Sequence, residues 1–329
     1  MLYQVLKAFV KLGMHWYIPD LRTHQLDLAK YEAPSIIVSN HPNSFFDALV
    51  IAVHAPAEIR YLTRGDIFKH PLANWALRRL FMLPIYKKSD DSEYSVKNDF
   101  TYDECMRQFQ AGKHILIFPE GRSHNLWHLQ YLMQSGVTSL LQRAYRADIP
   151  VQVQPYVLNY NSFSDVPKAV SITALSPIDS TDFIDGHVVR AAEVIENTKD
   201  DLKANMAHKP LDPLEKSEKG LAWMRIPAKI GYYTQFWFYK LWRDYVRKKT
   251  EGTIFYDSLL FGALLLSYPV FVVLLSVIVG KLLGFWVGLF LFLFLPATSY
   301  CLAKCQKIKV ETDLETKKVN YFSDVKATD

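Results

Sequence analysis

The stretch APSIIVSNHPNSFFDALVIAVHA, residues 33–55, joins a short β-rich run to an apolar helical run through a polar turn. Three further β-rich runs follow along the chain: HILIFPE, PVQVQPYVL and AVSITAL, residues 114–120, 150–158 and 169–175. Segments with helical patterns separate these runs. Strands that alternate with helices predict an α/β domain with a mostly parallel sheet flanked by helices.

The composition limits the class of protein. The chain has 329 residues, 50% of them hydrophobic and 22% charged, which is enough apolar material for a core and excludes a disordered or fibrous chain. The net charge of +5 is too small to indicate a nucleic-acid partner without a basic stripe on a recognisable fold. Three cysteines, Cys105, Cys301 and Cys305, contain no C-x-x-C pair, which favours a reducing compartment and no structural zinc.

Two uncharged apolar runs occupy residues 259–280 and 282–303, and each is about long enough to cross a bilayer. They predict a C-terminal helical hairpin, with buried core helices of a soluble domain as the alternative. Pro269 and Pro296 interrupt the runs, so both a transmembrane and a re-entrant hairpin remain open. Basic residues flank the pair and place both ends on the cytoplasmic face by the positive-inside rule: Arg243, Arg247, Lys248, Lys249, Lys304, Lys307 and Lys309.

Two other segments have the composition of membrane-interface helices. Residues 230–249 mix eight tyrosines, tryptophans and phenylalanines with cations, although the same aromatic face could pack on the protein. Apolar residues recur at helical spacing from Leu2 to Val10, without the small-residue cleavage site of a signal peptide.

These patterns together predict six regions. They are a membrane-interface helix (1–20), an α/β domain (21–208), a polar linker (209–220), an aromatic and basic interfacial helix (221–250), the two-span hairpin (254–303) and a polar cytoplasmic tail (304–329). The prediction is an integral membrane protein whose α/β domain lies on the cytoplasmic face.

The turn after the first β-rich run contains the first candidate for chemistry. His41 follows the strand and Asp47 lies at the start of the helical run, where a carboxylate could orient the imidazole as a base for a hydroxyl. Ser44 and Asp47 also fit a capping box, which would give Asp47 a purely structural role. Both interpretations remain open at this point.

A second candidate follows the run at residues 114–120. Glu120, Gly121, Arg122 and Ser123 offer a tight turn, a guanidinium suited to a phosphate and a hydroxyl donor, although Ser123 could merely cap the next helix.

Two smaller features lie near these turns. Lys87 and Lys88 follow a short apolar run and could add cations at the same edge of the sheet, or form a solvated turn. His124 and His128 have a helical spacing compatible with a metal, but no third ligand accompanies them, so we predict no metal site. The G-x-S-x-G sequence of serine lipases is absent.

Four blocks in order resemble the glycerol-phosphate and lysophosphatidate acyltransferase family. They are NHPNSFFD, LPIYKK, FPEGRS and PVQVQPYVLNY, residues 40–47, 83–88, 118–123 and 150–160. The resemblance covers roughly residues 1–210. The sequence departs from the usual family pattern in three places. Five residues separate His41 from Asp47, where four are usual. The second block has lysine where arginine is common, and the third reads EGRS where EGTRS is common.

The resemblance implies a role for each site residue. His41 would be the general base that deprotonates the acceptor hydroxyl and Asp47 would orient it. Glu120, Gly121, Arg122, Ser123 and either Lys87 or Lys88 would lie at the acceptor phosphate. It further implies acyl-CoA or an acyl carrier protein as the donor substrate, no other cofactor, and membrane lipids and a glycerol-phosphate acceptor as partners.

The expected activity is transfer of a fatty acyl group to glycerol-3-phosphate or 1-acylglycerol-3-phosphate in phospholipid biosynthesis. Acylation of another lysophospholipid or of an aminolipid is the nearest alternative. A thioesterase or transacylase would use the same base, and a catalytically silent membrane adaptor would keep the same fold.

Overall fold

The computed structural model describes residues 2–310, apart from 88–91, 133, 187 and 215–220. Within these residues the chain forms an eight-stranded sheet with the order β1-β7-β6-β2-β5-β3-β4, and β8 pairs with β6. The strands are β1 (Asp20–His24), β2 (Ser35–Ser39), β3 (Ile59–Arg64), β4 (Met82–Ile85), β5 (His114–Ile117), β6 (Gln152–Tyr160), β7 (Ala169–Ala174) and β8 (Ile178–Asp179). A separate hairpin pairs β9 (Ile184–Asp185) with β10 (Val188–Val189).

The mostly parallel sheet that the sequence predicts is confirmed. Strands β6, β2, β5, β3 and β4 all run in the same direction. The reverse direction begins at β7, which is antiparallel to β6 and carries β1 parallel to itself at the edge. Strand β2 lies between β6 and β5 with all five of its residues buried, as expected for a central strand covered on both faces.

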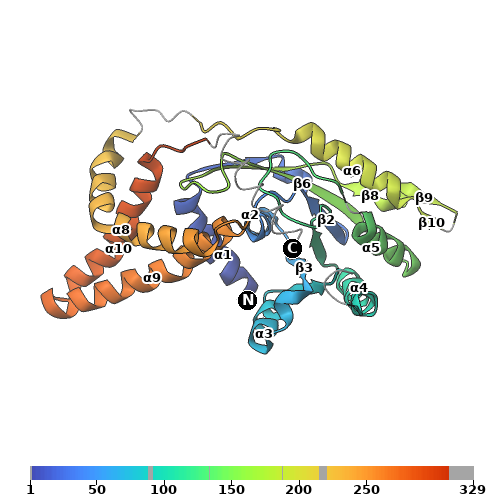
Figure 1. Cartoon of the computed structure of the whole chain (residues 1–329), viewed down its shortest axis with the longest axis horizontal. Coiled ribbons are helices and arrows are strands. Elements are labelled where there is room, and N and C mark those ends of the chain that lie inside the picture. The colour runs from blue at the N-terminus through green and yellow to red at the C-terminus, as the bar shows by residue number, and fades with distance from the viewer. Residues whose placement is uncertain (1, 88–91, 133, 187, 215–220, 311–329) are drawn as a thin grey trace.

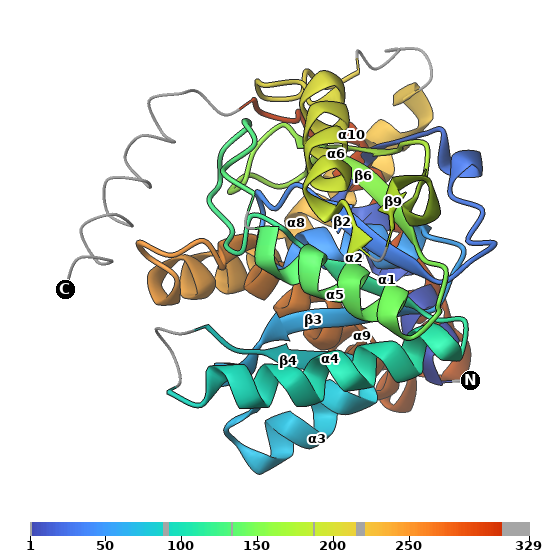
Figure 2. The ribbon, with the colours of Figure 1, turned by 90° about the vertical axis from the view of Figure 1, so that its right-hand side faces the viewer.

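Helices cover both faces of this sheet (Figures 1 and 2). On one face lie α1 (Leu2–Tyr17) and α2 (Phe45–His54); on the other lie α4 (Tyr94–Gln110), α5 (Gln134–Arg146) and α6 (Ala191–Asn205). Helix α3 (Pro71–Arg79) packs beside β4. Single 3-10 turns complete this part of the chain at Leu26–Leu28, Gly65–Phe68 and Ser180–Phe183.

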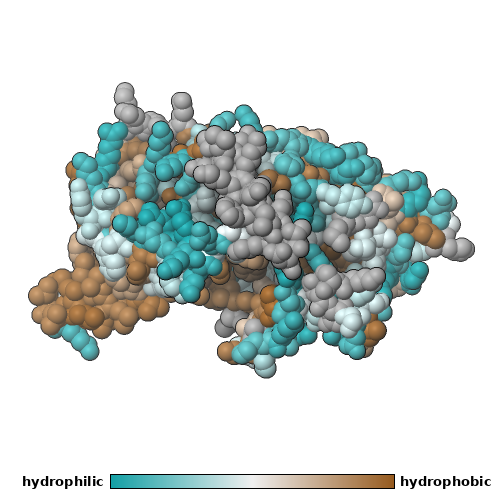
Figure 3. Space-filling view, in the orientation of Figure 1, coloured by the Kyte–Doolittle hydropathy of each residue, from teal (hydrophilic) through white to brown (hydrophobic). Residues whose placement is uncertain are grey.

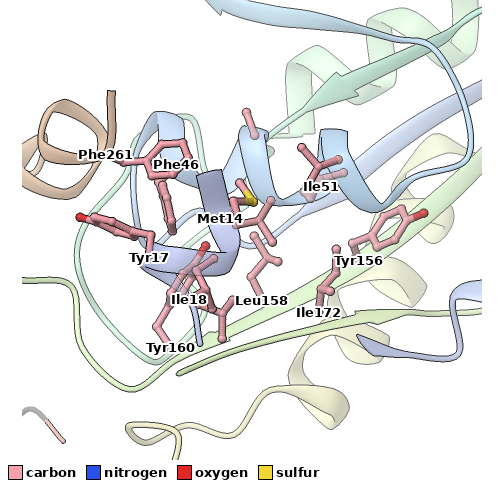
Figure 4. Close-up of a cluster of buried hydrophobic side chains, with 14 of the residues drawn as sticks. Met14, Tyr17, Ile18, Phe46, Ile51, Tyr156, Leu158, Tyr160, Ile172 and Phe261 are labelled. Atoms are coloured by element: carbon pink, nitrogen blue, oxygen red, sulfur yellow. The ribbon is translucent and has the colours of Figure 1, made fainter. Parts of the chain in front are cut away.

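The core on the α1 and α2 face joins distant parts of the chain. Met14 and Tyr17 of α1 and Phe46 of α2 pack in the cluster that also holds Tyr160 of β6 (Figure 4). Phe261, from the C-terminal apolar run, belongs to the same cluster, with its ring centroid 5.1 Å from that of Tyr17. The α/β domain and the apolar hairpin therefore share one hydrophobic core.

The two apolar runs form the helices α9 (Tyr256–Leu283) and α10 (Phe285–Cys305), which project from the α/β part of the molecule (Figures 1 and 3). At 1.5 Å per residue they are about 42 Å and 32 Å long. Both are long and apolar enough to cross a membrane, and only 11% and 22% of their most apolar windows are buried. That exposure rules out the alternative of buried core helices. Gly288 of α10 lies so close to Gly280 of α9 that a side chain at position 288 would clash.

Helix α8 (Arg225–Lys249), which follows a 3-10 turn at Ala222–Met224, has two different faces. Gln235 and Phe238 are buried, and Gln235 Nε2 donates to the carbonyl oxygen of Leu295 on α10 at 3.0 Å. Tyr233 and Trp237 are 80% and 53% exposed. The helix thus packs on the hairpin through one face and exposes aromatic side chains on another.

Several elements differ from the sequence prediction. Strands β1 and β3 and helix α3 have no counterpart among the predicted runs. Positions 215–220 of the predicted linker and 311–329 of the predicted tail lie outside the described residues.

His114 makes the stability of the fold depend on pH. Burial, followed by the charges of Lys113 and Arg60, lowers the pKa of His114 from 6.5 to about 4. Between these values the unfolded chain binds a proton that the folded chain does not, so unfolding becomes more favourable as the pH falls. We expect this group to remove roughly 2 kcal/mol of unfolding free energy between pH 7 and pH 5. Thermal unfolding of His114→Phe in detergent should show a smaller loss over that range, and an unchanged pH dependence would contradict the assignment.

Candidate active site

The parallel strands bring the candidate polar turns of the sequence together at one edge of the sheet, where their carboxyl ends lie. The turn at Asn40 follows β2, the turn at Phe118 follows β5, and Lys87 follows β4. Ligands of open α/β sheets bind at this edge. The two turns are joined directly, because the amide of Asn125 donates to the carbonyl oxygen of Pro42 at 2.8 Å.

Asn40 determines where β2 stops and the turn begins. Its side-chain amide donates to the carbonyl oxygen of Leu158 at 2.8 Å, and its side-chain oxygen accepts from the amide of Leu158 at 2.9 Å. The side chain thereby replaces the backbone in the pairing with β6. The chain is free to turn away from the sheet, and His41 is placed at its edge.

His41 and Asp47 form a close pair. Nδ1 of His41 lies 2.9 Å from Oδ2 of Asp47, and the two side chains are 17% and 0% exposed. A carboxylate only accepts hydrogen bonds, so Nδ1 carries the proton and donates it, which leaves Nε2 as the basic nitrogen. The imidazole stacks on Phe118 with centroids 3.8 Å apart, which fixes the plane of the ring.

Asp47 is held by two further donors. The amide of Asn43 donates to Oδ2 at 2.7 Å, and the hydroxyl of Tyr160 donates to Oδ1 at 2.7 Å. Burial and the adjacent Asp47 charge raise the pKa of Tyr160 well above its usual value, so the phenol keeps its proton. The capping-box alternative is wrong, because Asp47 accepts from these groups and the side chain of Ser44 makes no capping hydrogen bond.

Glu120 is buried beneath the two turns. Its Oε1 accepts the backbone amide of His41 at 2.6 Å, and its Oε2 accepts from His124 Nε2 at 2.7 Å and from the amide of Gln130 at 2.8 Å. The side chain is 0% exposed. All of these contacts are with other groups of the protein. Through the backbone amide of His41, Glu120 helps to hold His41 in place. A role for Glu120 at a ligand stays a prediction.

The turn after Glu120 is lined by cations. Gly121 has a φ of 69°, a left-handed value that favours glycine, and its carbonyl oxygen accepts from Lys87 Nζ at 2.8 Å. Arg122 is exposed and Ser123 is half-buried. Ser123 does not cap a helix, because the next helix that the structure describes starts at Gln134. Lys88 lies outside the described residues.

The two histidines of this turn lie in different surroundings. His124 is hydrogen-bonded to Glu120 through Nε2 and accepts the amide of Leu126 through Nδ1, whereas His128 is exposed. Across the described residues, no group of three or more histidine, cysteine or acidic side chains could hold a metal ion.

Some residues of the site had no predicted role. Tyr160 lies just after a predicted β-rich run and inside the fourth sequence block, but the sequence pattern assigns it no role, and His124 is weighed there only as a metal ligand. The sequence signal for Tyr160 is a polar-tipped aromatic at the carboxyl end of a parallel strand. Asn40 stood in the first block, but its pairing with Leu158 depends on a contact 118 residues along the chain.

Comparison with known proteins gives one family. The model of the family described as Acyltransferase matches residues 20–154. Among solved structures, the 1-acyl-sn-glycerophosphate (LPA) acyltransferase PlsC from Thermotoga maritima is similar at 17% sequence identity and a TM-score of 0.45. That match covers 61% of this chain and 78% of the other. No curated protein matches the chain significantly.

Glu120→Gln tests the internal role of this carboxylate. The glutamine side chain has one oxygen that accepts hydrogen bonds and one NH₂ group that donates them. The NH₂ group would face a donor whose hydrogen bond the Glu120 carboxylate now accepts, so a buried donor would be left unpaired. We expect the free energy of unfolding in detergent to fall by about 1–3 kcal/mol. Glu104→Gln is the matched control, because Glu104 forms a partly exposed pair with Arg107 on α4 and should lose less than about 1 kcal/mol. Equal losses in the two variants would contradict the internal role.

Proposed function

We propose that the protein transfers a fatty acyl group from a thioester to the hydroxyl of a glycerol phosphate, and the match of residues 20–154 to the model of the family described as Acyltransferase supports this proposal. The acceptor is glycerol-3-phosphate or 1-acylglycerol-3-phosphate. The observation that carries the proposal is the 2.9 Å contact between His41 Nδ1 and Asp47 Oδ2, at the edge of the sheet where ligands bind. This contact prepares the other ring nitrogen to act as a base.

The reaction follows from this geometry. His41 Nε2 takes the proton of the acceptor hydroxyl while its oxygen attacks the thioester carbonyl carbon. Asp47 orients the imidazole and stabilises the positive charge that forms on it. The tetrahedral intermediate then expels the thiolate, which receives the proton from His41. The products are an ester and a free thiol, and His41 returns to its starting state.

The cations of the second turn suit the phosphate of the acceptor. Nζ of Lys87 donates to the carbonyl oxygen of Gly121, and Arg122, the next residue in the chain after Gly121, is exposed. An ammonium and a guanidinium both form charge-assisted hydrogen bonds with phosphate oxygens. Binding there would hold the acceptor with its hydroxyl toward His41.

The donor in this proposal is acyl-CoA or an acyl carrier protein, and no further cofactor takes part. A thioester carbonyl is already activated, so the base and the bound acceptor supply the remaining chemistry. The α9–α10 hairpin would place the site beside the bilayer, where acyl chains and lysolipids partition. Cations at the ends of the hairpin, including Lys249 and Lys304, favour a cytoplasmic site.

Removal of the base tests the proposal. Purified protein in detergent would be given a labelled acyl thioester together with glycerol-3-phosphate or with 1-acylglycerol-3-phosphate. We expect a new ester with one acceptor, and at least a 1,000-fold lower rate in His41→Ala, because about this much catalysis is lost when a general base and its orientation are removed. Asp47→Asn should lose about 100-fold or more, because the imidazole loses its oriented tautomer.

The products separate this proposal from its alternatives. A new ester only on another lysophospholipid or an aminolipid would keep the mechanism and change the acceptor. Free fatty acid in place of ester would indicate a thioesterase. No product from folded protein with any of these acceptors would favour a silent adaptor.

Lys87→Met tests the phosphate site. The variant keeps the length of the side chain but loses the ammonium, so we expect the KM for the phosphate-bearing acceptor to rise about 10-fold with kcat little changed. Lys113→Met is the matched control, because its ammonium pairs with Glu58 at 3.1 Å, beside the amino ends of β5 and β3 and so at the opposite edge of the sheet. Steady-state kinetics of both variants give the comparison. An equal rise in both would contradict a local role for Lys87.

A further inference from the structure

A buried ion pair joins the apolar hairpin to the α/β domain. Oδ2 of Asp257, in the first turn of α9, lies 2.7 Å from Nζ of Lys168, which precedes β7. Both side chains are 0% exposed. Removing two charges from water is costly, and a pair of this kind is tolerated only where further hydrogen bonds satisfy it.

These hydrogen bonds come from three distant segments. The hydroxyl of Tyr17 on α1 donates to Oδ1 of Asp257 at 2.8 Å, and Nδ2 of Asn43 donates to Oδ2 at 2.7 Å. Lys168 also donates to the carbonyl oxygen of Ser162 at 2.7 Å. Burial, together with the Asp257 charge, raises the pKa of Tyr17 well above its usual value and keeps this phenol a donor.

The same contacts reach the candidate site. Asn43, whose side chain is held by Asp257, donates its backbone amide to Asp47 Oδ2, the oxygen that His41 contacts. Directly before Asp47 in the sequence, the amide of Phe46 donates to Oγ of Ser258 at 3.0 Å. The first turn of α9 thus holds the loop that carries the pair at two points.

The packing around these bonds is dense. The ring centroid of Phe46 lies 5.3 Å from that of Phe261 on α9 and 5.4 Å from that of Tyr17 (Figure 4). The loop therefore contacts the hairpin through apolar side chains as well as hydrogen bonds.

We propose that Asp257 is a positioning residue, which fixes the His41–Asp47 loop to the start of the membrane hairpin through Asn43. Acyl transfer then depends on α9 as well as on the α/β domain. The kinetic part of this inference rests on the proposed function. A misplacement of about 1 Å at a reacting centre can lower a rate about 100-fold, so loss of the tether should be visible in kcat.

The test removes both charges together. Asp257→Leu alone would leave Lys168 buried without its counter-charge, and the variant could fail to fold. The double variant Lys168→Met with Asp257→Leu replaces the pair with apolar side chains, an exchange that is often neutral for stability. Trp16→Phe is the matched control: it removes the 3.1 Å hydrogen bond from Trp16 Nε1 to the Pro296 carbonyl oxygen, a tether between α1 and α10 that does not involve the loop.

We expect the double variant to unfold at a lower temperature than wild type, because the Tyr17 hydroxyl and the Asn43 side-chain amide lose their acceptor. Assayed below that temperature, it should lose about 10- to 100-fold in kcat, with KM little changed, while Trp16→Phe keeps its activity. Asn43→Ala should lose a similar factor, and adding it to the double variant should cost little more, because both changes break the same connection. Full kcat in a folded double variant would overturn the inference, as would fully additive losses. Either of these two overturning results would mean that the ion pair has a purely structural role.

Hydrogen exchange separates this inference from the function. In the double variant the amides of Asn43 and Phe46 should exchange at least 10-fold faster than in wild type, with the amides of β2 unchanged. If wild type makes no ester, the proposed function fails, yet the exchange data still test the tether. Unchanged exchange at positions 43 and 46 would overturn the tether even in an active enzyme.

Discussion

Three hydrogen-bond donors converge on the buried carboxylate of Asp47, and the arrangement of the site depends on this convergence. The donors are the ring of His41, the amide of Asn43 and the hydroxyl of Tyr160. A buried carboxylate without such partners would be strongly destabilising, so the loop after β2 is held in the conformation that supplies them. Within that loop Ser44 has a φ of 54° and a ψ of −142°, values that a residue with a side chain rarely adopts and that the surrounding contacts maintain.

The parts of the fold that follow from local patterns could be predicted from the sequence. The alternation around residues 33–55 predicts a parallel strand, a turn and a helix, and it places His41 and Asp47 near each other because only five residues separate them. Lys87 was expected at the same edge of the sheet as Gly121, and the structure joins the two. The pairing of β1 with β7 could not be predicted, because it joins segments about 150 residues apart and depends on the direction in which β7 returns.

The parts of the site that were missed depend on burial and on long-range contacts. An acidic residue after a strand suggests ligand binding, but Glu120 turns inward, where three donors satisfy its carboxylate. Asp257 stands at the start of an apolar run, a position that is typical of a helix N-terminus. Its partner Asn43 lies 214 residues earlier, so no window of the sequence contains both. Residues of this kind are visible only once the sheet and the hairpin are packed together.

The bond between Tyr17 and Asp257 spans 240 residues and has a consequence for biosynthesis. A ribosome releases the chain from its N-terminus, at about 5–20 residues per second, so α1 and all strands of the sheet emerge before α9 is made. During that interval Lys168 and Asn43 have no carboxylate to contact, and the loop with His41 is incomplete. The contacts that hold the segment from His41 to Asp47 are therefore complete only after the hairpin has been synthesised and has docked, so the arrangement of this turn depends on the folding of the C-terminal helices.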